Sequence, residues 1–169
     1  IFGSRDLHAD PSALLAMSRV TRDQVFEPFL AMLRDHAIVA TWATVGHLFL
    51  SHAERVSGRL HPDVVPPQHS WLREPWFDGI PAGSEQTHPE YYGRSLLLRL
   101  RDEGQEIGSH SFSHPVFGDP GCSRETAETE LARAVAEAAA LGVTMRSFVF
   151  PRNIPGHVDI LARHGFTCW

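Results

Sequence analysis

The sequence contains little cysteine, no long apolar run and no excess of positive charge, and each of these absences argues against a class of protein. Its two cysteines, Cys122 and Cys168, have no C-x-x-C spacing, so neither a disulfide framework nor a cysteine zinc site is indicated. The absence of any run of 18 apolar residues argues against a membrane-spanning helix. The formal net charge of -5 offers no broad positive field for nucleic acid or an anionic membrane surface.

The composition is that of an ordinary globular domain, with 43% hydrophobic and 21% charged residues in 169. The amino terminus lacks the basic and apolar regions of a signal peptide, which slightly favours a cytoplasmic protein. Because the chain opens with Ile1 rather than methionine, a signal peptide that has already been removed is an alternative, and the compartment stays undecided. Both ends resemble interrupted segments, and we interpret residues 1–169 as a single domain that is a fragment of a larger one.

The first half of the chain predicts one helix, one strand and one long insertion. Apolar residues at helical spacing predict a helix over Thr21–His36, with Thr21 as the N-cap and Pro28 as a kink. The β-branched and aromatic run Ile38–Val45 predicts a buried strand. Six prolines among the 34 residues 56–89 exclude one regular element, so this segment is interpreted as an insertion or loop.

The second half alternates helices and strands. The expected elements are a helix over Tyr91–Glu103, a strand over Gln105–Ser109, a helix over Ser123–Leu141 with Ser123 as N-cap, a strand over Arg146–Phe150, a helix over His157–His164 and a final strand. This alternation predicts an α/β fold in which helices cover a parallel sheet. Periodicity does not choose between an open doubly wound sheet and a barrel.

Two histidines follow the strand predicted to end at Ser109. His110 and His114 stand four residues apart at the carboxyl end of that strand, where α/β folds gather their functional groups. Pro115 disfavours a helical conformation at His114, so a loop must bring the two rings together. Neutral imidazoles are good ligands for zinc, but a catalytic zinc site needs a third protein ligand from elsewhere.

The residues around this pair carry a family resemblance. The run Glu106–Pro115, Glu-Ile-Gly-Ser-His-Ser-Phe-Ser-His-Pro, resembles the histidine motif G-(N/S)-H-(S/T)-x-x-H of the polysaccharide deacetylase family, also known as the NodB-homology or carbohydrate esterase family. Ala40–Gly46 resembles that family's A-T-F-F-x-x-G strand and stands in the expected order. Ser147–Asn153 takes the place of its R-x-P-Y-G motif but departs from it, because Arg152 follows the proline and an asparagine replaces the glycine.

The resemblance implies a deformed (β/α) barrel that is incomplete at both ends. It further implies a metal-dependent hydrolase that removes acetyl groups from a carbohydrate, with His110 and His114 as ligands of a divalent ion. Zinc is the first expectation, and cobalt, nickel or manganese are alternatives. Arg152 would orient a catalytic carboxylate or contact the substrate. The family's T-F-D-D-G motif, which carries the catalytic aspartate, does not occur in the sequence and is expected upstream of Ile1.

The remaining candidates have plain explanations as well as functional ones. Near the amino terminus, loop capping is favoured over a catalytic role for Asp6, His8 and Asp10. In the insertion, His69 and His88 are within reach of a groove. The aromatic side chains there form either a sugar-stacking surface or, as we favour, a small core; they are Trp71, Trp76, Phe77, Tyr91 and Tyr92. The other histidines have no motif support; they are His36, His47, His52, His61, His157 and His164.

Two other functions stay open at this stage. The same fold can hydrolyse a carbon–nitrogen bond in a small amide such as a cyclic ureide. The insertion and the altered motif at Ser147–Asn153 are compatible with this alternative. The second alternative is an inactive carbohydrate-binding domain, which the lack of an aspartate motif favours. The deacetylase and the inactive binding domain would both have a carbohydrate as their partner, whereas the small-amide hydrolase would not.

Overall fold

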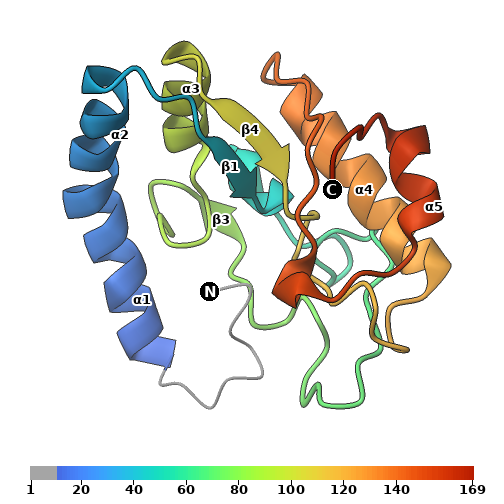
Figure 1. Cartoon of the computed structure of the whole chain (residues 1–169). Coiled ribbons are helices and arrows are strands. Elements are labelled where there is room, and N and C mark those ends of the chain that lie inside the picture. The colour runs from blue at the N-terminus through green and yellow to red at the C-terminus, as the bar shows by residue number, and fades with distance from the viewer. Residues whose placement is uncertain (1–10) are drawn as a thin grey trace.

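The computed structural model describes residues 11–169, which begin with one long helical rod. In this rod, α1 (Pro11–Val20) continues through a π-helical turn (Thr21–Val25) into α2 (Phe26–Asp35) (Figure 1). Pro28 accounts for the interruption, because a proline inside a helix lacks the N–H that would bond to the preceding turn, and its ring crowds the carbonyl there. The wider π turn just before the proline relieves this conflict.

The prediction that a helix begins at Thr21 with that residue as its N-cap is wrong. Thr21 lies between two helical segments, and its Oγ1 donates a hydrogen bond to the carbonyl of Met17, one turn earlier, at 2.9 Å. Such back-bonding satisfies a hydroxyl group inside a helix. The apolar stripe was recognised correctly, since Phe26, Leu30 and Leu33 are the buried residues of α2.

A short parallel pair of strands forms the centre of the fold. β1 (Thr41–Thr44) and β4 (Glu106–Ser109) pair in register from their first residues to their last. The parallel order continues beyond β4 only as isolated bridges, which join β4 to Phe148 and Ser147 to Cys168. The two strands predicted after the alanine-rich helix are therefore reduced to bridges, although their parallel direction agrees with the predicted α/β class.

Helices lie on both sides of these strands, as Figure 1 shows, with α2 on one side and α4 on the other. α3 (Arg94–Asp102) precedes β4, and α4 (Arg124–Ala139) follows the histidine loop. The predicted cap of α4 is confirmed, because the side chain of Ser123 accepts a hydrogen bond from the backbone N–H of Thr126. The last predicted helix is present, with α5 (Val158–Leu161) continued by a 3-10 turn to His164 and ended at Gly165.

The proline-rich segment 56–89 is largely irregular, as expected. A two-residue antiparallel pair, β2 (His52–Ala53) with β3 (Gly83–Ser84), is its main regular contact. Several of its side chains nevertheless enter the core; they are Leu60, Val64, Trp76, Phe77 and Ile80. The interpretation of Trp76 and Phe77 as core residues rather than an exposed sugar platform is therefore confirmed.

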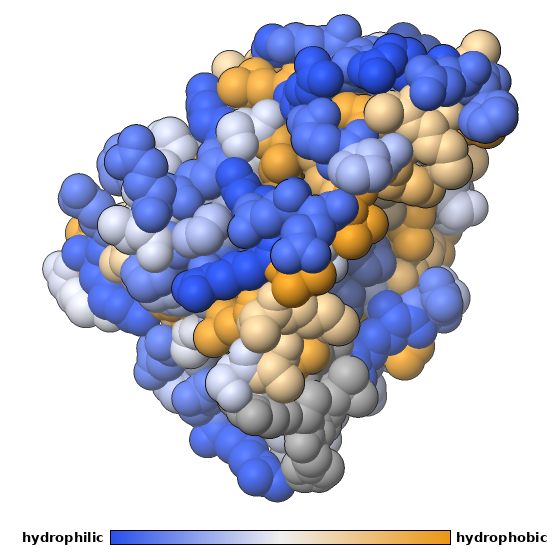
Figure 2. Space-filling view, turned by 90° about the vertical axis from the view of Figure 1, so that its left-hand side faces the viewer, coloured by the Kyte–Doolittle hydropathy of each residue, from blue (hydrophilic) through white to orange (hydrophobic). Residues whose placement is uncertain are grey.

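One face of the molecule exposes apolar side chains. Figure 2 views the molecule from the side of α1 and α2, where orange patches reach the surface. The exposed large apolar residues of this rod are Met17, Val20, Val25, Phe29 and Met32. The rod thus packs only part of its circumference against the body. No helix within residues 11–169 is both long and apolar enough to cross a membrane.

Candidate functional site: a paired-histidine loop

The loop that follows β4 brings the two predicted histidines together. The ring centroids of His110 and His114 lie 4.6 Å apart, with the rings at 69° to each other. Backbone conformation produces this arrangement, because Ser111 and His114 both adopt left-handed φ angles, of 63° and 70°. The expectation that Pro115 excludes a helix and that a loop joins the rings is confirmed.

His110 is fixed in one neutral tautomer by a backbone carbonyl. Its Nδ1 lies 2.7 Å from the carbonyl oxygen of Val149, which belongs to the segment that bridges to β4. A carbonyl oxygen can only accept, so Nδ1 carries the proton and Nε2 keeps its lone pair. Burial lowers the pKa of His110 from its ordinary value, and the bond to Val149 only partly opposes this. The ring is therefore neutral, and the lone pair of its Nε2 is available to coordinate a metal ion.

His114 is neutral for a related reason. The side chain is buried, and desolvation together with the neighbouring His110 ring lowers its pKa to about 4. Metal binding requires deprotonated imidazole, so two neutral rings side by side near pH 7 do not have to release protons before they coordinate an ion. The electrostatics of the pair thus suit a metal ligand better than a general acid.

The carbonyl groups of the loop are anchored to the 3-10 turn that follows β1, at residues Gly46–Phe49. The N–H of Gly46 donates to the carbonyl of Ser111 at 2.8 Å, and the N–H of His47 donates to the carbonyl of Phe112 at 2.9 Å. A glycine favours this close approach, because a Cβ on Gly46 would lie 3.1 Å from the Cα of Phe112 and would have to displace it slightly. The family-like Gly46 therefore permits the contact that orients the histidine loop.

The N–H groups of the same loop are anchored to α4. Glu130, which is fully buried, accepts hydrogen bonds at Oε2 from the N–H groups of Phe112 (2.9 Å) and Ser113 (2.7 Å). The Ser113 hydroxyl donates to Oε1 of the same carboxyl group and accepts a bond from Trp76 Nε1 at 2.6 Å. The sequence reasoning missed Glu130, although one signal was available. Position 130 falls on the stripe of α4 that is otherwise small or apolar and buried, at Ala127, Leu131, Ala134 and Ala138.

Within the described part of the chain, the histidine loop offers two candidate metal ligands. Among residues 11–169, no group of three or more histidine, cysteine, aspartate or glutamate side chains is placed to hold a metal ion. Asp6, His8 and Asp10 lie outside the described residues. Two neutral imidazoles, one with a fixed Nδ1 proton, fit part of the donor set of a zinc site, which in catalytic sites comprises three protein ligands and an open position.

His69 has a structural role. Its Nδ1 donates to Asp119 Oδ1 at 2.8 Å, while its Nε2 accepts a bond from the N–H of Val116 at 3.2 Å. Both ring nitrogens are therefore engaged in tying the insertion to the chain that follows the histidine loop. His69 also stacks on Trp71, with ring centroids 4.7 Å apart. These contacts explain the position of His69 within the insertion, and the expectation that it lies within reach of a groove stays a prediction.

Arg152 lies over an aromatic ring from the insertion. Its guanidinium carbon is 5.6 Å from the centroid of the Trp71 ring, a cation–π contact. The backbone of Arg152 is left-handed (φ 59°) in a short 3-10 turn three residues after Val149, whose carbonyl binds His110. Arg152 thus links Trp71 of the insertion to the segment whose Val149 carbonyl holds His110.

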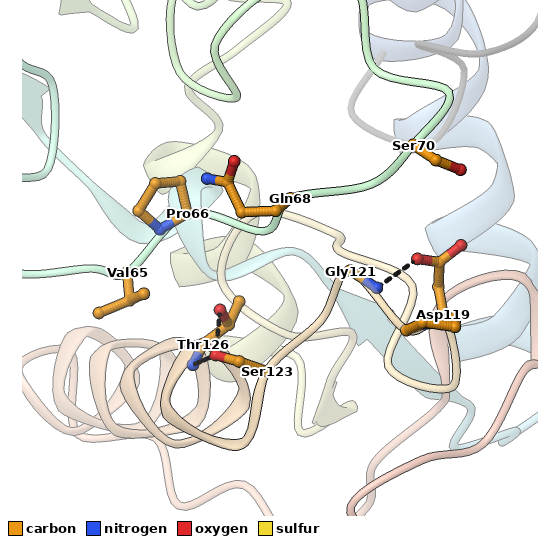
Figure 3. Close-up of a pocket in the computed structure, with 9 residues that line it drawn as sticks. Val65, Pro66, Gln68, Ser70, Asp119, Gly121, Ser123 and Thr126 are labelled. Carbon is orange, nitrogen blue, oxygen red and sulfur yellow. Dashed lines mark hydrogen bonds between the residues drawn. The ribbon is translucent and has the colours of Figure 1, made fainter.

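A pocket of about 480 Å³ opens where the insertion meets the loop before α4. Figure 3 shows Val65, Pro66 and Gln68 on one side of it, opposite Gly121 and the start of α4. Its lining also includes Ser70, Asp119, Pro120, Ser123 and Thr126. The two histidines of the pair are not part of this lining. The shape of the pocket depends on the insertion, because residues 65–70 of the insertion form one of its walls.

The fold and the site together define an α/β protein of partial-barrel type with a paired-histidine loop at the carboxyl end of a central strand. A family model described as polysaccharide deacetylase matches residues 16–168, and the chain belongs to that family. A search of curated proteins finds no significant match.

A solved structure supports the same fold. It is the crystal structure of a mutant CE4 family pseudoenzyme with restored enzymatic activity, with a TM-score of 0.53 and 17% sequence identity. The alignment covers 85% of this chain and 38% of the other, so the present chain spans well under half the length of that structure. At this identity the likeness concerns the fold, which agrees with the predicted deformed α/β barrel.

Proposed function

We propose that this chain contributes the histidine half of a metal-dependent site that removes acetyl groups from a carbohydrate. The observation that carries the proposal is the convergence of two neutral imidazoles, with Nε2 of His110 available, at the carboxyl end of β4. Membership of the polysaccharide deacetylase family supports the reaction class. Zinc is the ion that this donor set favours first, with cobalt, nickel or manganese as alternatives.

Each residue has a distinct part in this proposal. His110 and His114 bind the ion, and the carbonyl of Val149 keeps His110 in the ligating tautomer. A bound divalent ion lowers the pKa of a coordinated water and polarises a carbonyl group. Arg152, held over Trp71, contacts the sugar or orients a carboxylate. A catalytic aspartate remains expected from outside residues 1–169, as the family resemblance implies.

Metal retention provides the first test. The purified chain is stripped with a chelator, loaded with zinc or cobalt, dialysed and analysed for bound metal. We expect about one ion per chain, lost in the double variant His110→Ala/His114→Ala. The matched control is His36→Ala/His52→Ala, which removes two exposed histidines and should keep the ion. A parent chain that retains no more metal than the His110/His114 variant would contradict the proposal.

The substrate class is tested separately on the loaded chain. Release of acetate from N-acetylated or O-acetylated oligosaccharides, abolished in the His110→Ala/His114→Ala variant, would support the deacetylase assignment. Ring opening of a cyclic ureide without acetate release would instead favour the small-amide alternative. Binding of the oligosaccharide that is unchanged in the His110→Ala/His114→Ala variant, with neither reaction in the parent, would favour the non-catalytic carbohydrate-binding alternative.

A further inference from the structure

We propose that Glu130 is a positioning residue of the histidine pair. Its buried carboxyl group holds the turn Ser111–Ser113 so that His110 and His114, on either side of that turn, present their rings to one space. The expected effect of Glu130 on metal binding rests on the proposed function, whereas its effect on the conformation of the histidine loop does not. Nothing in the family-like motifs around the histidines identifies this residue, which lies 16 positions beyond His114.

Four backbone groups of the turn are bound by residues from outside the loop. The carbonyls of Ser111 and Phe112 are bound by the N–H groups of Gly46 and His47. The N–H groups of Phe112 and Ser113 are bound by Glu130. All of these groups lie in buried residues, where an unpaired donor is costly. Glu130 is therefore the acceptor for both N–H groups at the centre of the turn.

The backbone is strained at the first residue of the turn and just after its last. Ser111 and His114 have left-handed φ angles, which residues with a Cβ rarely adopt. Such conformations persist only where surrounding contacts impose them. One local bond, from the N–H of His114 to Ser111 Oγ at 2.9 Å, spans the turn. Two more local bonds involve Ser111, from its N–H to Ser109 Oγ at 3.2 Å and from its hydroxyl to the carbonyl of His110 at 2.5 Å. From outside the loop, the carboxyl group of Glu130 fixes the centre of the turn.

The chemistry of the Glu130 side chain suits the donors of the turn. Two N–H groups and one hydroxyl group converge on Glu130, and a carboxyl group can accept all three while an aliphatic side chain can accept none. Arg133, a cation on the same helix, pairs instead with Asp63 and Glu137. Burial raises the pKa of Glu130 to about 7, and the hydrogen bonds from Ser113 and Phe112 oppose this shift. A buried carboxyl group without a cation is unfavourable in itself. Its presence on a packed helix face therefore serves the hydrogen bonds to the loop.

The experiment compares imidazole nitrogen resonances of His110 and His114, by NMR at pH 7, in the metal-free chain and its variants. Glu130→Met fills the same space but accepts no strong hydrogen bond, whereas Glu130→Gln keeps an acceptor for the two N–H groups. We expect both rings to shift in Glu130→Met and to return close to the parent in Glu130→Gln. Glu125→Met is the matched control on the same helix, since the side chain of Glu125 is exposed.

Ring resonances of a folded Glu130→Met variant that coincide with those of the parent would overturn the proposal. So would shifts no larger than those of the control. If Glu130→Met does not fold, Glu130→Asp decides, because it withdraws the carboxyl group by one methylene yet keeps it polar. Unchanged ring resonances there would equally overturn the proposal, and displaced ones would support it.

Metal affinity gives a second readout with its own meaning. For a parent chain that binds zinc, competition against a chelator should show affinity lowered about 10-fold or more in Glu130→Met, as is typical when support of a metal ligand is lost, and largely restored in Glu130→Gln. Equal affinities in all three chains would contradict a positioning role. A parent chain that binds no zinc counts against the proposed function, and the metal-free NMR comparison still decides the role of Glu130.

Discussion

The buried ring of His61 makes the stability of this fold depend on pH. Only 5% of the residue is exposed, and its ring packs edge-on against Phe112, with centroids 4.9 Å apart. Desolvation, followed by the neighbouring His47 and Arg133, lowers the pKa of His61 from 6.5 to about 3. Asp63 opposes the shift, and Arg55 adds to it. The native state therefore keeps His61 neutral in a range where the unfolded chain protonates it.

The sign of the effect follows from this difference. Because the folded pKa is depressed, the contribution of His61 is fully present above about pH 6.5 and is lost as the pH falls toward 3. With an unfolded pKa near 6.5, the unfolded state gains roughly 2 kcal/mol from protonation of this one ring between pH 7 and pH 5. Below about pH 3 the ring protonates in both states, and no further loss arises from it.

Urea unfolding at pH 7 and pH 5, with a chelator present, measures this contribution. We expect the parent to lose about 2 kcal/mol more between the two pH values than His61→Phe, which cannot be protonated. The other histidines remain in both chains, so their contributions cancel. His52→Phe, at an exposed position, controls for the loss of one imidazole. Equal pH-dependent losses in the parent and His61→Phe would refute the reasoning.

Two further predictions concern close packing and thiol reactivity. Gly46→Ala should lower the free energy of unfolding by about 1–3 kcal/mol in thermal or urea denaturation, because the new Cβ would lie 3.0 Å from the Cα of Ala134. Gly93→Ala, where contacts begin at 3.5 Å, should cost less, and equal losses would contradict this view. A thiol reagent should label exposed Cys168 rapidly and spare Cys122, whose pKa burial raises to about 12. Rapid labelling of a Cys168→Ser variant would count against that prediction.

Local patterns predicted the parts of the structure that depend on local chemistry. Ser123 was recognised as a helix cap because a serine before an alanine-rich run satisfies the first N–H groups within three residues. The histidine pair was found because a strand followed by His110 and His114 is a short-range signal. Only the second half of the rod was predicted, because the segment that contains α1 has no clear periodic apolar stripe. The kink expected at Pro28 takes the form of a π turn just before that residue.

The partners of the histidine loop could not be predicted in the same way. Val149 and Glu130 are distant from His110 in the sequence, and only the tertiary fold brings their oxygen atoms to the loop. A buried glutamate in a small-residue helix stripe indicates an unusual environment, but it does not say which donors it meets. Pairing of this kind depends on how β4, α4 and the bridging segment pack, which no local pattern contains.

The conformation of the loop itself shows why the sequence alone was insufficient. Serine and histidine disfavour left-handed φ angles, so a local reading would not place Ser111 and His114 there. Bonds from the turn after β1 and from α4 fix the loop between them, and these outweigh the local preference. Local preference and tertiary packing disagree at the two residues that bring the rings together, and such disagreement is expected at functional sites.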